Sequence, residues 1–92
     1  MEFEWDKEKA KENFRKHAVS FEEAELAFED ENGIEGFDEF NSSEEMRYRL
    51  IALSPKRLLF VSYTIRDEEI IRIISARKAT TIEKNFYNDA RR

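Results

Sequence analysis

The chain has 92 residues, and a chain of this length buries only about 60–65% of its unfolded surface, so its core is limited. It has no cysteine, which excludes disulfides, cysteine-based zinc sites and thiol catalysis. Its first six residues lack a signal-peptide pattern, and no apolar run approaches the roughly 18 residues of a membrane helix. We therefore expect one cytoplasmic domain over residues 1–92, with no membrane partner.

The net charge of −5 is unevenly distributed along the chain. Residues 1–46 hold five Lys/Arg and sixteen Asp/Glu, a net charge of −11, whereas residues 47–92 hold eleven Lys/Arg and five Asp/Glu, a net charge of +6. An acidic chain would ordinarily count against nucleic-acid binding, but a basic half leaves that function open.

The acidic half is predicted to begin with a short strand and two helices. Residues 2–5 alternate polar and apolar, which is typical of a half-buried strand, and Asp6 can cap a helix over residues 7–17. Ser20 can cap a second helix, with Glu23 completing a capping box. The faces expected to be buried hold Ala10, Asn13, Phe14 and His17 in the first helix and Phe21, Ala24, Ala27 and Phe28 in the second.

The basic half is predicted to supply a meander of antiparallel strands and a final helix. Residues 46–54, 58–66 and 69–78 are rich in β-branched and aromatic side chains, and residues 34–40 add a weak, acidic edge strand. The strand at 69–78 is apolar on both faces, so we expect it to be central and covered on both sides. Thr80 can cap the last helix. Its apolar stripe holds Ile82, Phe86 and Ala90.

This order of elements indicates an α+β fold: an antiparallel β-sheet packed with two N-terminal helices and one C-terminal helix.

Basic residues around the last strand form a candidate anion site. Arg72 lies inside an apolar run, where an unpaired charge is costly, so it is either paired with an acidic residue of the N-terminal half or part of an anion site. Arg77 and Lys78 end the strand just before the helix N-terminus at Thr80, where free amides and the helix dipole favour an anion. A solvated strand end is the alternative.

Other basic residues are interleaved with aromatic ones. Arg47, Arg49 and Arg66 fall in the predicted strands near Tyr48 and Tyr63. Cations bind phosphates and rings stack on bases, so the pattern fits single-stranded RNA, although cross-strand packing of Tyr on Arg gives the same pattern.

Residues for metal or nucleophilic catalysis are scarce. His17 is the only histidine, which either caps carbonyls and packs beside Phe14 or serves in acid–base catalysis. Two glycines cannot build a phosphate-binding loop, and residues 30–33 lack EF-hand spacing. We expect no metal and no cofactor.

Motifs spread along the chain are similar to those of one known family. They are Trp5-Asp6, Lys9, Asn13, Lys16-His17 and Val19–Ala24, then Glu45 and Arg47, then Tyr63, Thr64 and Arg66, and finally Arg72–Thr80 with Glu83 and Tyr87. From Phe3 to Tyr87 the chain resembles the BrnT toxins, which are ribonuclease toxins of type II toxin–antitoxin systems.

The resemblance implies a RelE-like fold and a bacterial, metal-independent endoribonuclease that inhibits translation by cutting RNA. It also implies a partner, BrnA, an antitoxin with a ribbon-helix-helix DNA-binding part. Toxin and antitoxin would form a heterotetramer, with DNA contacted only through the antitoxin.

Metal-free RNA cleavage uses the ribose 2′-OH as nucleophile and needs a base, an acid and cations around the phosphorane. The expected catalytic residues are Arg72 and Arg77 in a phosphate clamp and His17 and Glu45 as acid–base groups. The expected substrate-binding residues are Arg47, Tyr63, Arg66, Lys78 and Thr80, with Tyr63 also a weaker proton donor. The alternative is a non-catalytic protein-interaction module derived from a toxin that has lost cleavage.

Overall fold

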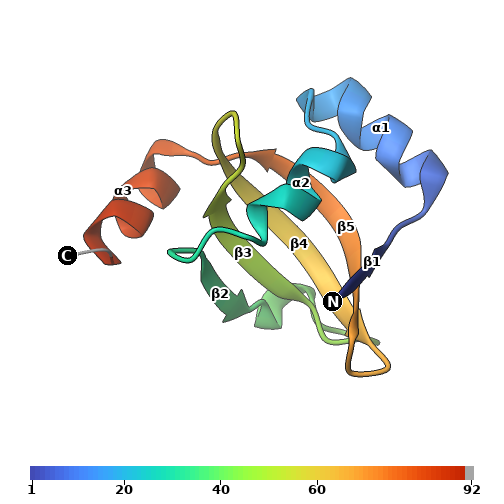
Figure 1. Ribbon diagram of the computed structural model, residues 1–92. Coiled ribbons are helices and arrows are strands. Elements are labelled where there is room, and N and C mark those ends of the chain that lie inside the picture. The colour runs from blue at the N-terminus through green and yellow to red at the C-terminus, as the bar shows by residue number, and fades with distance from the viewer. Residues whose placement is uncertain (91–92) are drawn as a thin grey trace.

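The computed structural model describes residues 1–90, which form a five-stranded sheet with two helices over one face and a third helix beyond one end (Figure 1). In chain order the elements are β1 (Glu2–Glu4), α1 (Lys7–His17), α2 (Phe21–Ala27), β2 (Ile34–Phe37), the 3-10 turn η1 (Glu39–Asn41), β3 (Tyr48–Leu53), β4 (Leu58–Arg66), β5 (Ile70–Lys78) and α3 (Thr81–Ala90). None of the described helices has the length and apolar character needed to cross a membrane.

Side-chain caps fix the starts of the first two helices. The Asp6 carboxylate accepts hydrogen bonds from the amides of Glu8 and Lys9, which confirms the predicted start of α1. The Ser20 hydroxyl accepts from the Glu23 amide at the start of α2. The other half of the predicted capping box is wrong, because the Glu23 carboxylate is turned to Arg57 and Ser54 instead.

The sheet has the order β1-β5-β4-β3-β2. The predicted antiparallel meander of β3, β4 and β5 is confirmed, and β2 lies at an edge as expected. The strand β1 joins the other edge in parallel to β5, so the sheet is mixed. That pairing brings the first strand of the acidic half beside the last strand of the basic half.

A bulge in β5 decides which side chains share a face. Ser62 pairs with Ser75 and Tyr63 pairs with Ile73, so the residue between them on β5, Ile74, has no partner on β4. Strict alternation would place Arg72 and Arg77 on opposite faces. The extra residue instead places both on the face away from α1 and α2.

The helix-covered face holds the core. Its largest fully buried side chains include Leu59, Val61 and Tyr63 of β4 and Ile73 of β5, packed with Phe21 of α2. The expectation that β5 is covered on both sides is wrong, because its buried residues Ile71, Ile73 and Ala76 all belong to this face while Arg72 stays partly exposed on the other. We call the second face the open face.

Asn13 closes the edge of β5 beyond the end of β1. Its side-chain oxygen accepts from the Ala76 amide at 3.1 Å, and its nitrogen donates to the Ala76 carbonyl at 2.8 Å and the Val19 carbonyl at 3.0 Å. Only Asn13 of the predicted inner stripe of α1 is buried, whereas Phe14 is 57% exposed and His17 is exposed. The amide therefore replaces a missing strand residue.

The predicted apolar stripe of α3 is wrong as a packing face. Ile82 is 81% exposed and Phe86 is 56% exposed, whereas Tyr87 is 2% exposed and donates a hydrogen bond to Asp30. The helix extends past β3 rather than lying flat on the sheet (Figure 1). The side of α3 that carries Tyr87 therefore packs on the rest of the protein, and the side that carries Ile82 and Phe86 does not.

Candidate nucleic-acid interface

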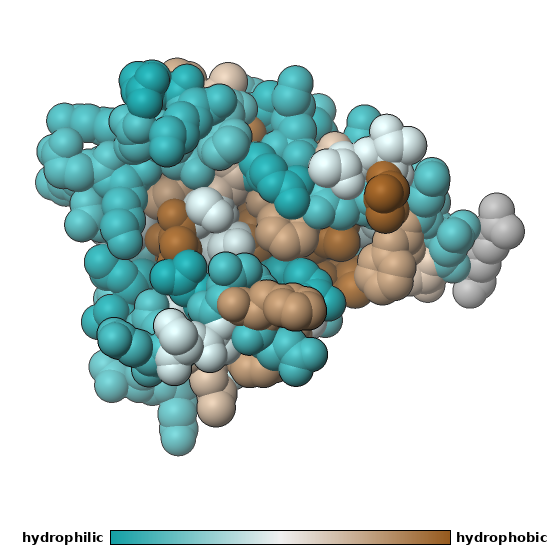
Figure 2. Space-filling model, turned by 180° about the vertical axis from the view of Figure 1, so that it is seen from behind, coloured by the Kyte–Doolittle hydropathy of each residue, from teal (hydrophilic) through white to brown (hydrophobic). Residues whose placement is uncertain are grey.

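The open face carries four arginines on three adjacent strands. Arg49 of β3 pairs in register with Ser62 of β4, and Phe60 of β4 pairs with Arg77 of β5. The remaining two are Arg66 of β4 and Arg72 of β5. Seen from behind in Figure 2, this side shows apolar surface near its centre and hydrophilic side chains around it. A face of this composition can bind an anion that also carries apolar rings.

Arg72 is held by a carboxylate of the acidic half. Its Nη1 donates to Glu4 Oε2 at 2.7 Å, and Arg66 Nε lies 3.9 Å from the same oxygen. The side chains of Arg72 and Glu4 are 29% and 37% exposed. The ion pair with the N-terminal half, one of the two alternatives for Arg72, is therefore present, and the group stays accessible to solvent.

Arg77 is held by a carboxylate from α3. Its two terminal nitrogens donate to the two oxygens of Glu83 at 2.8 and 2.9 Å, and its guanidinium carbon lies 4.2 Å from the centre of the Phe60 ring. The same carboxylate accepts from the Thr80 amide at 2.9 Å. Hydrogen bonding from Arg77, ahead of that from Thr80, lowers the pKa of Glu83 despite its partial burial.

The anion at the start of α3 is thus supplied by the protein itself. The Thr80 hydroxyl accepts from the Glu83 amide, which completes a reciprocal capping box. Lys78 is exposed at the end of β5 and makes no ion pair among residues 1–90. Any phosphate bound at Thr80 must compete with Glu83.

Thr64 lies next to Arg72 across the β4–β5 pair. It is 2% exposed, and its hydroxyl is the only buried side-chain polar atom within the described residues that has no hydrogen-bond partner. Most buried polar groups in proteins are satisfied, so an unpartnered hydroxyl at the position paired with Arg72 is unusual. Sequence reasoning included Thr64 in a motif but gave it no role.

The predicted mixture of arginines and base-stacking tyrosines is wrong. Tyr48 and Tyr63 pair across β3 and β4 and stack on each other on the helix-covered face, opposite Arg49 and Arg66. Tyr63 is 1% exposed and its hydroxyl donates to Glu35. Burial, with this hydrogen bond as a second cause, raises the pKa of Tyr63 far above its usual value. These rings are core residues.

Two predicted residues precede β3 rather than lying in it. Arg47 is in the loop before the strand, where its amide donates to the Ser42 hydroxyl and its carbonyl accepts from the Asp38 amide. The prediction that Arg47 belongs to a strand is therefore wrong. Glu45 is exposed in the same loop. Among the described residues, Glu45 makes no ion pair with the arginines of the open face.

His17 ends α1 on the surface. It is exposed and borders a shallow hollow lined also by Asn13, Lys16, Ile74 and Ser75. No hydrogen bond within the described residues involves its ring, so the structure does not show the capping role. The hollow lies beside the bulge of β5.

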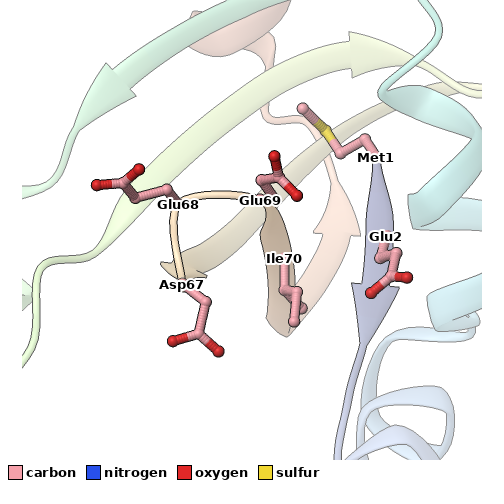
Figure 3. Close-up of a pocket in the computed structure, with 6 residues that line it drawn as sticks. All are labelled: Met1, Glu2, Asp67, Glu68, Glu69 and Ile70. Carbon is pink, nitrogen blue, oxygen red and sulfur yellow. The ribbon is translucent and has the colours of Figure 1, made fainter.

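A second hollow is acidic and does not fit a phosphate. It lies between the start of β1 and the β4–β5 turn, and Figure 3 shows the carboxylates of Glu2, Asp67, Glu68 and Glu69 pointing in different directions. Across the part of the chain that the structure describes, no group of three or more His, Cys, Asp or Glu side chains could hold a metal ion.

Sequence reasoning did not identify Glu4 or Glu23 as partners of arginines on other elements. Glu4 was read only as part of a short strand, although its alternation with Phe3 and Trp5 already placed it away from the core. Glu23 is 7% exposed and accepts from Arg57 Nη2 at 2.8 Å and from Ser54 at 2.7 Å. No local signal identified Arg57, because its partner is 34 residues away.

Comparison with known proteins places this geometry in a family. The model of the family described as "Ribonuclease toxin, BrnT, of type II toxin-antitoxin system" matches residues 5–83. The crystal structure of the ribonuclease toxin BrnT from Brucella abortus superposes with a TM-score of 0.64 at 20% identity, covering 88% of this chain and 99% of that chain. At this identity the likeness concerns the fold. No curated protein sequence matches the chain significantly.

Proposed function

Because the chain belongs to the BrnT family of ribonuclease toxins of type II toxin–antitoxin systems, we propose that it is an endoribonuclease that cleaves RNA in the cytoplasm without a metal ion and so inhibits translation. The observation that carries the proposal is the arginine pair of the open face, Arg66 and Arg72, whose guanidinium groups both lie within 4 Å of one carboxylate oxygen of Glu4.

The pair supplies what metal-free cleavage of a phosphodiester requires. The transition state is a phosphorane with excess negative charge, and fixed cations aimed at it lower the barrier. Arg72 is held in place by β5 and by Glu4, so its guanidinium needs little reorganisation to meet a phosphate. Arg77 lies on the same face of the same strand and extends the basic surface along the RNA backbone, with Lys78 and Thr80 beyond it.

The family also supports a partner. We propose that the chain is neutralised by a BrnA-type antitoxin with a ribbon-helix-helix part, in a heterotetramer that contacts DNA only through the antitoxin. The exposed Ile82 and Phe86 of α3 offer apolar surface that a partner protein can cover.

A non-catalytic interaction module remains the second candidate, and one observation favours it. Both Arg72 and Arg77 are engaged by carboxylates of the chain itself, as in ordinary structural ion pairs. Under this reading the protein binds a partner but turns over no RNA.

The test is cleavage of a single-stranded RNA by the purified chain in the presence of EDTA. We expect cleavage that falls about 10²- to 10³-fold in Arg72→Ala, since the lost donor acts on the developing charge. Lys56→Ala removes a cation from the β3–β4 turn and serves as the matched control, with activity unchanged.

Circular dichroism must show that both variants are folded. Growth arrest on expression, relieved by a co-expressed antitoxin, is the corresponding result in cells. A folded wild-type chain that leaves RNA intact, or equal cleavage by Arg72→Ala, would contradict the nuclease and favour the module.

A further inference from the structure

We infer that Glu4 is the general base of the reaction, the group that takes the proton from the ribose 2′-OH while Arg72 and Arg66 bind the adjacent phosphate. The inference rests on the proposed ribonuclease function and adds a catalytic residue to it. Neither His17 nor Glu45 makes an ion pair or hydrogen bond with these arginines, whereas Glu4 contacts both.

The geometry of the substrate sets the requirement. In RNA the nucleophilic 2′-oxygen and the 3′-oxygen that carries the attacked phosphorus are attached to neighbouring carbons of one ribose. A base for the hydroxyl and a cation for the phosphate must therefore lie side by side. The 2.7 Å contact between Glu4 Oε2 and Arg72 Nη1 places a carboxylate and a guanidinium in this relation on one face of the sheet.

The pairing of strands holds the group there. Glu4 lies opposite Arg72 in the parallel β1–β5 register, and Arg72 lies opposite Thr64 in the antiparallel β5–β4 register. The three side chains thus form a row across three strands: carboxylate, guanidinium, hydroxyl. Secondary structure positions a site of this kind more rigidly than loops do.

One oxygen of Glu4 is available to act. Its Oε2 contacts both arginines, and its Oε1 accepts no hydrogen bond from any of residues 1–90. The other carboxylate of the open face, Glu83, has both oxygens engaged by Arg77 and one also by the Thr80 amide. Glu83 also has the less exposed side chain, at 17% against 37% for Glu4. Glu83 is therefore a structural partner, whereas Glu4 has the more exposed side chain and one oxygen that the described residues do not engage.

The cleavage step needs no reagent other than water. Glu4 Oε1 takes the 2′-hydroxyl proton, the 2′-oxygen forms a bond to phosphorus, and the bond from phosphorus to the 5′-oxygen breaks. The leaving 5′-oxygen takes a proton from water, and Glu4 returns its own to solvent. The products are a 2′,3′-cyclic phosphate and a 5′-hydroxyl.

The experiment compares Glu4→Gln with Glu2→Gln in single-turnover cleavage of a short RNA, with binding measured separately on the same RNA carrying 2′-deoxyribose. Both substitutions remove one charge from the same strand, two residues apart, and Glu2 contacts no arginine in the described chain. We expect a 10²- to 10⁴-fold loss of cleavage rate in Glu4→Gln, the usual contribution of a general base. Binding should change less than about threefold, and Glu2→Gln should match the wild type.

A further readout separates a base from a structural partner. Glu4→Asp, which keeps the carboxylate on a shorter side chain, should recover part of the activity.

The outcomes are distinct. Equal cleavage by wild type and Glu4→Gln overturns the inference alone, as does a loss of cleavage that matches a loss of binding. Tighter binding by Glu4→Gln with unchanged cleavage shows instead that Glu4 merely competes with RNA for the arginines, and also overturns it. Absence of cleavage by the wild-type chain overturns the proposed function itself.

Discussion

The two faces of the sheet use the same strands for different purposes. On the helix-covered face, Leu59, Val61 and Tyr63 of β4 are fully or almost fully buried, and they belong to the core. On the open face, Phe60 and Thr64 of the same strand lie opposite Arg77 and Arg72 of β5. Strand alternation therefore lets one segment carry both stability and a binding surface, and Leu59 and Ser62, which lie on opposite faces, should differ in their effect on stability.

Glu4 and Glu23, the two carboxylates of the acidic half that pair with arginines of the basic half, differ in the same way. Glu23 is 7% exposed and binds both Arg57 and Ser54, so its pairing is closed to solvent. Glu4 is 37% exposed and keeps one oxygen unbonded within the described residues. A closed pair contributes to stability, whereas an open pair leaves a charged group for chemistry.

The largest expected effect on stability lies in the core. Leu59→Ala should lower the free energy of unfolding by about 2–5 kcal/mol, because it leaves a cavity beneath the helices. Ser62→Ala, three residues along the same strand and partly exposed on the open face, should change it by less than about 0.5 kcal/mol. Urea unfolding measures both. Similar values for the two variants would contradict the division between the faces.

A substitution of Asn13 tests whether its side chain closes the edge of β5. Asn13→Ala should cost about 3 kcal/mol, since it leaves the amide and carbonyl of Ala76 unpaired at a buried edge. Asn85→Ala on the exposed side of α3 is the control and should have little effect. Hydrogen exchange of the Ala76 amide should accelerate in Asn13→Ala alone. Unchanged exchange would mean that the Asn13 side chain does not seal this edge.

Glu23 gives the smallest effect and a dependence on pH. Hydrogen bonding from Arg57 is the main cause that lowers the pKa of Glu23 below the ordinary value of 4.5. The stabilisation of the folded state by ionised Glu23 is therefore complete above the ordinary pKa of 4.5. It is lost as the pH falls through the lower pKa that Glu23 has in the folded state. Glu23→Gln should cost about 1 kcal/mol at pH 7, with a smaller difference from wild type in acid.

Thermal unfolding of wild type and Glu23→Gln over a pH series checks the sign of this dependence. Glu22→Gln, the exposed neighbour, should behave like the wild type at each pH. A difference between wild type and Glu23→Gln that stays constant with pH would show that the charge of Glu23 has no part in stability.

Local sequence signals predicted much of the fold. The caps at Asp6 and Ser20 and the meander of apolar runs set α1, α2 and the strands from β3 to β5. An ion pair of Arg72 with the acidic half was one of two alternatives, and the structure shows this pair with Glu4. What sequence could not show depends on distant pairing: the parallel contact of β1 with β5, the partnership of Glu23 with Arg57, and the amide of Asn13 at the edge of β5.

The candidate site was predicted less completely than the fold. Arg72 and Arg77 lie on one face, but Tyr63 is in the core and the Thr80 amide is occupied by Glu83. Periodicity assigns a side chain to one of two faces only while the period holds, and a bulge interrupts it without any glycine or proline to reveal it. Glu4 required knowledge of which strand lies next to β1.

The unpaired Ile74 has a consequence for comparing this chain with its relatives. Arg72 and Arg77 are an odd number of positions apart. They share a face only because the bulged residue between them, Ile74, has no partner on β4. A one-residue gap placed between them in an alignment is therefore no neutral difference in length. A relative that lacks one residue here can keep both side chains on the open face in a strand without a bulge, whereas a relative of equal length without the bulge would turn the residue aligned with Arg77 toward the helices. Relatives should therefore be matched here by parity before they are matched by residue type.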